Sequence, residues 1–114
     1  MKIINKTKNT VLAQNAIVAD TVFKRIKGLL ASKNFAEGEA LILKPCNSIH
    51  TFFMKFPIDV LFINKNNQII KAISSLPPFR LTYIYFNANF AIELPAGVIN
   101  STFTQAGDIL TIES

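Results

Sequence analysis

Residues 45–64, PCNSIHTFFMKFPIDVLFIN, constrain the fold more than any other part of this chain. In the run PIDVLFI within them, four of the seven residues are β-branched or aromatic and a fifth is Leu, a composition typical of a strand that packs in a core. The same segment holds the only histidine and the only cysteine of the chain. We therefore expect residues 45–64 to form the core of a small soluble domain and to carry its chemical site.

Short strands are predicted on both sides of this segment. Lys2 to Asn5 and Val11 to Gln14 are β-type runs joined by polar residues, which predicts a hairpin. A helix is expected from Asp20, which can cap it, to Leu30, because its apolar residues recur with helical spacing. Further β-type runs are ALILK, SIHTFFM, QIIKAIS, FAIEL and DILTIE.

The predicted fold class is α+β and mainly β: a small twisted sheet that closes toward a barrel, with one packed helix at about Asp20–Leu30. Residues 64–67 predict a turn between strands at 58–63 and 68–74, since asparagine tolerates positive φ. Two prolines, Pro77 and Pro78, must end the second strand. Between Pro95 and Gly107 a short irregular or helical stretch is expected.

Length and composition limit the organisation of the chain. The 114 residues suffice for one domain, 1–114, and 50% of them are hydrophobic, with ten Phe and no Trp. The formal net charge of +5 comes from Lys and Arg that are spread without a dense run, so no specific nucleic-acid partner is expected.

Compartment and membrane contact are judged from the same sequence. A single cysteine, Cys46, excludes an internal disulfide and suits a reducing compartment. The first residues lack an apolar stretch typical of a signal, and no apolar run approaches the roughly 20 residues of a membrane span. We expect a cytoplasmic protein without a membrane span, and the oligomeric state stays open.

Strand geometry argues against a thiol–imidazole pair. If residues 46–54 are extended, Cys46, His50 and Met54 share one face, but Cys46 and His50 then lie about 13 Å apart. The alternative is that Cys46 is a small buried apolar residue and that His50 is hydrogen-bonded at the sheet surface.

Two acidic residues interrupt apolar strands. Asp59 shares a strand face with Leu61 and Ile63, so its carboxylate needs an ion pair or hydrogen bonds. Its expected partners are Arg25, Arg80 or His50, or backbone donors of the turn after Pro57. Glu93 repeats the pattern within FAIEL, and we expect it near Asp59. A structural and a functional carboxylate remain equally open for Asp59.

Known catalytic and metal-binding motifs are absent from the sequence. The acidic residues, His50 and Cys46 match no HExxH, EF-hand or zinc-ribbon spacing, and no metal or cofactor is predicted. Four glycines leave little for a phosphate-binding loop, and there is no GxGxxG or GxSxG. Nucleotide-dependent chemistry is therefore not expected.

Five short pieces occur in a fixed order along the chain: Arg25-x-x-Gly28-Leu29, Ser48-Ile-His50-Thr51-Phe-Phe-Met54, Pro57-Ile-Asp59-Val-Leu-Phe62, Glu93-Leu-Pro95-Ala-Gly97 and Gly107-Asp108. Together they resemble the domain of unknown function 192 family, an uncharacterised family widespread in bacteria and archaea, over nearly the whole chain. The resemblance implies a fold unit and a set of characteristic positions, without a reaction. Leu30 stands where that family usually has Met and Phe53 where many members have Trp; both keep apolar bulk.

Three functions follow from these observations. The first is a binding module for a small molecule or peptide, through a polar pocket formed by Arg25, His50, Thr51, Met54, Asp59, Arg80 and Glu93. The second is an acid–base or hydrolytic enzyme that uses Asp59, Glu93 and His50. The third is a structural or protein-interaction domain with an exposed strand edge or apolar patch. The ligand or substrate and the physiological process stay open.

Overall fold

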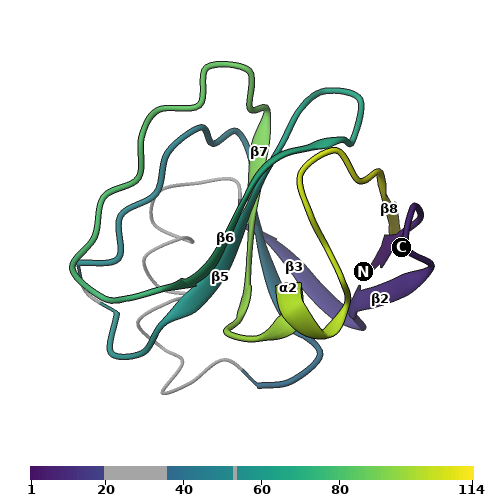
Figure 1. Cartoon of the computed structure of the whole chain (residues 1–114), viewed down its shortest axis with the longest axis horizontal. Coiled ribbons are helices and arrows are strands. Elements are labelled where there is room, and N and C mark those ends of the chain that lie inside the picture. Colours follow the sequence, from purple (N-terminus) through teal and green to yellow (C-terminus); the bar gives the residue numbers. More distant parts are fainter. Residues whose placement is uncertain (20–35, 53) are drawn as a thin grey trace.

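The computed structural model describes residues 1–19, 36–52 and 54–114, which contain eight strands and one short helix (Figure 1). The mainly β prediction is confirmed. The helix predicted at Asp20–Leu30 lies outside the described residues. The elements are β1 (Lys2–Asn5), β2 (Thr10–Ala13), β3 (Asn15–Ala19), β4 (Glu39–Leu43), β5 (Ile58–Ile63), β6 (Ile69–Leu76), β7 (Phe90–Pro95), α2 (Val98–Ser101) and β8 (Leu110–Glu113).

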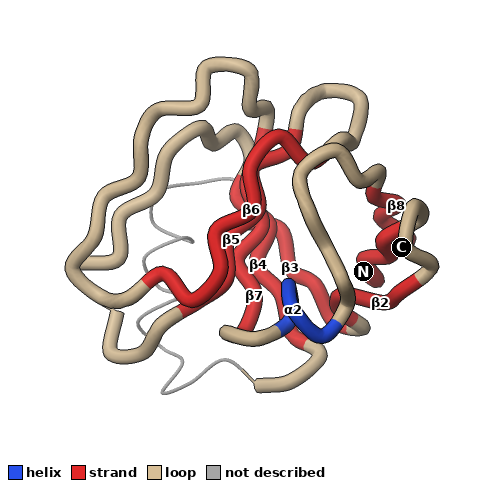
Figure 2. The backbone as a smooth tube through the Cα atoms, viewed as in Figure 1, coloured by secondary structure: helices blue, strands red, loops and turns tan. Residues whose placement is uncertain are grey.

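The strands form two sheets (Figure 2). A three-stranded sheet has the order β2-β1-β8, and a five-stranded sheet has the order β3-β4-β7-β5-β6. All neighbours are antiparallel except β3 and β4. The predicted closure toward a barrel is wrong for the described strands, because the chain changes sheets at Gln14, where pairing with β1 ends and pairing with β4 begins.

The three central strands of the five-stranded sheet, β4, β7 and β5, are largely buried on both faces. Leu61 and Ile63 of β5 belong to an apolar cluster shared with the three-stranded sheet, and we call this face the sheet side. Val60 and Phe62 belong to a second cluster on the opposite face. We call this face the ribbon side, because a ribbon of two paired segments, residues 46–52 and 79–86, lies beside it. Every residue of β5 is therefore buried, and the expectation that this strand forms the core is confirmed.

Two long connections pair with each other beside the ribbon side, and we call residues 46–52 and 79–86 together the ribbon. The Thr51 amide donates to the Arg80 carbonyl at 2.8 Å, and the Thr82 amide donates to the Ile49 carbonyl at 2.9 Å. Figure 1 shows the two segments running alongside each other at the left, with the later one outside. The ribbon extends the fold beyond the named strands.

The strand predicted over SIHTFFM is only partly present. His50 forms an isolated antiparallel bridge with Leu81, but the Met54 amide donates to the Thr51 carbonyl at 3.1 Å, so the chain turns there. Strict alternation from Cys46 to Met54 is therefore wrong: Phe52 is exposed and Met54 is buried.

The other local predictions agree with the structure. The hairpin of β1 and β2 is present, as is that of β5 and β6, and β6 ends before Pro77. Helix α2 occupies the stretch predicted to be irregular or helical. In the turn between β5 and β6, Asn67 has φ 60°, and the Asn64 side-chain oxygen accepts from the Asn66 and Gln68 amides.

Replacement of Asn67 tests how much this turn depends on a positive φ. Asn67→Val should lower the free energy of unfolding by about 1–2 kcal/mol, because β-branched residues tolerate left-handed backbone poorly, whereas Asn67→Gly should not. Urea denaturation measures both values. Asn66→Ala, in the same exposed turn, is the matched control, and an Asn67→Val variant as stable as this control would contradict the prediction.

Candidate functional site

Asp59 is a buried carboxylate that ties three parts of the chain together. It is 0% exposed in β5. Its Oδ1 atom accepts from the Ser75 amide at 2.8 Å, and its Oδ2 atom accepts from the Gly97 amide at 3.1 Å and the Ile99 amide at 2.8 Å. The carboxylate thus joins β6 to the first turn of α2. The prediction that it requires partners is confirmed, but these donors come from β6 and the start of α2, not from the turn after Pro57.

The two acidic residues predicted to lie together occupy opposite faces of the sheet. Asp59 pairs with Leu94 in the ladder between β5 and β7, and Leu94 belongs to the sheet side. Glu93, 1% exposed, pairs with Val60 of the ribbon side. Alternation along β7 therefore separates the two carboxylates by the thickness of the sheet. The expected pairing of Glu93 with Asp59 is corrected accordingly.

Four other predicted residues gather around the ribbon. The Arg80 amide donates to the Thr51 hydroxyl at 3.0 Å, and that hydroxyl donates to the Pro77 carbonyl at 2.7 Å. Met54 is buried in the apolar cluster of the ribbon side. The His50 ring is exposed and stacks on the Phe52 ring, with 5.2 Å between centroids. Thr51, Met54, His50 and Arg80 are thus neighbours, while Asp59 is on the other face of the sheet.

Two further residues considered from the sequence are Arg25 and Cys46. Arg25 lies outside the described residues. The Cys46 thiol donates to the Ser48 carbonyl at 3.1 Å. Among the described residues, no three His, Cys, Asp or Glu side chains are grouped so that they could hold a metal ion. The one helix in the described part of the chain is too short to cross a membrane.

Large apolar side chains are exposed on the outer face of the ribbon. Tyr83 and Phe86 are each 84% exposed, Phe79 is 70% exposed and Leu81 is 68% exposed. Ile84 is also exposed, and the stacked pair of His50 and Phe52 lies next to Leu81 across the bridge. Large apolar side chains thus face outward from a segment of eight residues.

Residues that face inward hold this segment in place. Thr82 is buried, and its hydroxyl accepts from the Ile49 amide at 2.9 Å. The Tyr85 ring packs against the Phe62 ring of β5, with 4.6 Å between centroids. The ribbon therefore has an inner face that belongs to the core and an outer face that contacts solvent.

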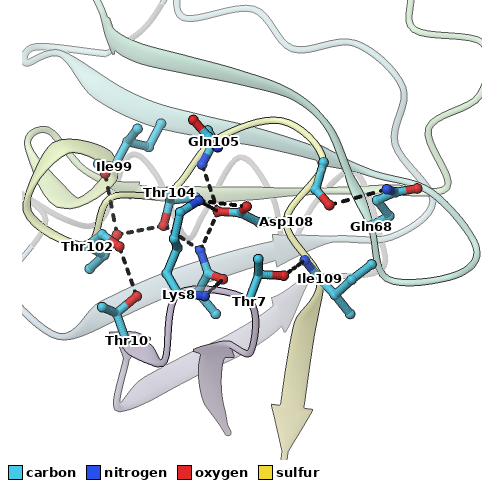
Figure 3. A network of polar contacts seen from close by, with 12 residues as sticks. Thr7, Lys8, Thr10, Gln68, Ile99, Thr102, Thr104, Gln105, Asp108 and Ile109 are labelled. Atoms are coloured by element: carbon cyan, nitrogen blue, oxygen red, sulfur yellow. Dashed lines mark hydrogen bonds and ion pairs between the residues drawn. The ribbon is translucent and has the colours of Figure 1, made fainter.

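A third buried carboxylate, Asp108, connects the first strand to the residues before the last (Figure 3). Its oxygens accept from the Lys8 ammonium at 2.8 and 2.9 Å, from the Asn5 amide side chain at 2.9 Å and from the Gln105 amide at 3.0 Å. Asn5 also donates to the Thr104 hydroxyl at 3.1 Å. Burial alone would raise the pKa of Asp108, but hydrogen bonds from Asn5, Lys8 and Gln105 outweigh it and lower that pKa.

Both features escape single-sequence reasoning for identifiable reasons. Asp108 appears in the sequence only as part of a Gly107-Asp108 turn, and Asn5 gives a weak signal as a polar residue at an inward position of β1. The run FRLTYIYF at 79–86 is apolar enough to be mistaken for core. Only its pairing with residues 46–52 shows which side chains are left outside.

The chain is thus a small two-sheet protein with an exposed apolar ribbon on one side. Comparisons with known proteins show the family to which it belongs. The model of the DUF192 family, described as "Uncharacterized ACR", matches residues 3–112. The chain therefore belongs to the domain of unknown function 192 family, which confirms the resemblance.

The relatives carry no assigned activity in their names. A UPF0127 protein of Thermococcus sibiricus is 34% identical over 110 residues, which cover 93% of this chain and 71% of that protein. A UPF0127 protein of Pyrococcus horikoshii is 31% identical over 93% of this chain and 94% of its own length. These two relatives are archaeal.

Two solved structures from bacteria share the fold. One is a protein of unknown function from Novosphingobium aromaticivorans, with a TM-score of 0.83 and 15% identity, covering 98% of this chain and 84% of that one. The other is described as a putative transcription regulator from Sinorhizobium meliloti, with a TM-score of 0.80 and 18% identity, covering 96% and 89%. At these identities the likeness concerns the fold alone.

Removal of the Asp59 charge should reveal its structural role. Asp59→Asn should lower the free energy of unfolding by about 2–4 kcal/mol, because an amide has one acceptor oxygen and turns an NH₂ group toward the remaining backbone donors. Urea denaturation of wild type and variant checks this value. The control is Glu113→Gln, at an exposed carboxylate, and equal stability of the two variants would show that the three hydrogen bonds contribute little.

Asp108 should make the protein sensitive to acid. Its pKa is lower in the folded state than the ordinary 3.8, so the stability it contributes is present above 3.8 and is lost as the pH falls toward the lower folded value. Asp108→Asn should cost about 1–3 kcal/mol at neutral pH. Urea denaturation of wild type and variant should show this difference shrinking below pH 3.8. A difference that stays constant with pH would contradict the prediction.

Proposed function

We propose that the chain is a binding module whose contact surface is the outer face of the ribbon and whose ligand is an extended peptide segment of another protein. The observation that supports this proposal most directly is the exposure of Leu81, Tyr83 and Phe86 beside the inward-facing Thr82 and Tyr85. A ribbon covered by solvent alone would be expected to carry polar side chains on its outer face. Contiguous exposed apolar residues are more typical of interaction surfaces.

Hydrogen bonds and ring packing hold the ribbon in place, and an ordered surface favours binding. Thr51 and Thr82 hydrogen-bond across it, and Tyr85 anchors it to the buried ring of Phe62. The outward-facing side chains are therefore presented by a backbone that is already ordered. Such preorganisation reduces the conformational entropy that a binding partner must overcome.

The backbone of the ribbon also suits a peptide. His50 and Leu81 form the type of antiparallel pair whose own amide and carbonyl groups do not face each other, because the bonds run between their neighbours. The N–H and C=O of Leu81 thus point to the outer edge of the ribbon. An extended peptide can add to such an edge, and its side chains can then contact the exposed rings.

The same geometry argues against the two uses of a shared polar site. A pocket that includes both Asp59 and Glu93 would have to span the five-stranded sheet, since the two residues are on opposite faces. An acid–base mechanism that pairs them meets the same obstacle. His50 and Arg80 of the predicted pocket are exposed on the ribbon and are included in the proposed surface, whereas Thr51 is buried beneath it.

Selection of peptides from a random phage-displayed library tests the proposal. Peptides enriched on the wild-type protein should bind the double variant Leu81→Ser, Tyr83→Ser at least about ten-fold more weakly, a loss of about 1.4 kcal/mol, because both side chains lie on the contact surface. Fluorescence polarisation with labelled peptides measures the dissociation constants. Both residues are exposed, so the thermal midpoint should change little.

The matched control is Phe103→Asn. Phe103 is 71% exposed, follows α2 and has φ 57°, a backbone conformation that asparagine accepts. Its replacement removes an exposed ring of the same kind away from the ribbon and should leave peptide binding unchanged. The proposal is overturned if no peptide is enriched, or if enriched peptides bind the ribbon variant as tightly as wild type.

A further inference from the structure

We infer that the peptide recognised by the ribbon is acidic as well as apolar, an inference that rests on the proposed function and specifies its partner. The ribbon lies in the longest part of the chain without an exposed acidic group. Between Ala40 and Ile92 the only Asp or Glu is Asp59, which is 0% exposed and bonded to backbone amides. Over the same residues the chain has five basic side chains: Lys44, Lys55, Lys65, Lys71 and Arg80.

Positive groups stand at both ends of the ribbon. Arg80 is exposed next to Leu81, and its guanidinium donates to the neighbouring Phe79 carbonyl at 3.5 Å. Lys44 is exposed at the other end, where its ammonium lies 5.4 Å from the centroid of the Phe90 ring. Guanidinium groups bind carboxylates with two parallel hydrogen bonds, so Arg80 is suited to an acidic side chain beside an apolar one.

The ribbon itself contributes no acidic side chain. Of the acidic residues that the structure describes, Asp59, Glu93 and Asp108 are buried, and Asp108 is bonded to Lys8. The exposed ones among residues 1–19, 36–52 and 54–114 are Glu37, Glu39 and Glu113, all outside the span from 40 to 92. A net positive field around the ribbon favours an anionic partner and speeds its association.

The chemistry of the outer face favours a peptide among the possible anions. Nucleobases stack on aromatic rings, but Leu81 and Ile84 are aliphatic and interrupt the aromatic series. Alternate side chains of an extended peptide can meet both kinds of residue, and its backbone can pair with Leu81. The ligand is therefore an extended segment that alternates apolar residues with Asp or Glu.

Three synthetic octapeptides test this inference on the full chain. Each alternates Val or Phe with a second residue, which is Glu in the first peptide, Gln in the second and Lys in the third. At low salt the Glu peptide should bind about ten-fold more tightly than the Gln peptide, and the Lys peptide should bind most weakly. This advantage should shrink at about 0.5 M salt, where exposed charges are screened.

Two variants separate charge from apolar contact. Arg80→Gln should bring the affinity for the Glu peptide down to that for the Gln peptide and leave the latter unchanged. Lys6→Gln removes an exposed cation in the turn between β1 and β2, on the three-stranded sheet, and should leave the Glu peptide's advantage intact. Fluorescence polarisation with labelled peptides gives all of these constants.

The outcomes distinguish the two proposals. Equal binding of the Glu and Gln peptides, lost in the double variant Leu81→Ser, Tyr83→Ser, would overturn the acidic partner and leave the binding module standing. Absence of binding by all three peptides would overturn the acidic partner, and together with a library that yields no peptide it would overturn both. Tighter binding of oligothymidylate, or of vesicles containing phosphatidylserine, than of the Glu peptide would also overturn the acidic peptide, in favour of a nucleic acid or a membrane surface.

Discussion

Strand β5 has a layer of apolar side chains on each face, so any polar group that enters it needs a partner from within the protein. Asp59 meets this requirement with backbone amides from β6 and from the start of α2. Two of these bonds, from the Gly97 and Ile99 amides, hold the connection from β7 to the single turn of α2 against β5. Burial of β5 thus constrains the positions of β6 and α2, which supply the donors for Asp59.

Cover for the two faces of this strand comes from different kinds of structure. The three-stranded sheet covers one face, and it is closed by Asp108, which joins the first strand to the residues before the last. Ribbon residues such as Ile49 and Tyr85 contribute to the cover of the other face. Since the ribbon is only one layer thick, its outer side chains remain in solvent, and the segment that completes the core also provides the proposed contact surface.

Much of the candidate site could be predicted one residue at a time. Period-two alternation correctly placed Asp59 with Leu61 and Glu93 with Ala91, because side chains alternate strictly within paired strands. Their relation to each other could not be predicted, since it depends on the register between β5 and β7. Alternation also failed between Phe52 and Met54, where a turn at Thr51 interrupts the extended chain. The hydrogen bond from the Met54 amide to the Thr51 carbonyl, which no sequence pattern encodes, accompanies the change of face at Met54.

By itself, the sequence determined the mainly β class, both hairpins, the turn at Asn67 and the need of Asp59 for partners, because these follow from local periodicity and backbone preference. Tertiary structure decided the division into two sheets, the separation of Asp59 from Glu93 and which side chains of residues 79–86 are exposed. The physical reason is that apolar composition shows which residues prefer to leave water, whereas long-range pairing decides which of them become buried. In the ribbon, the Thr82 side chain is buried and the neighbouring Tyr83 side chain is exposed.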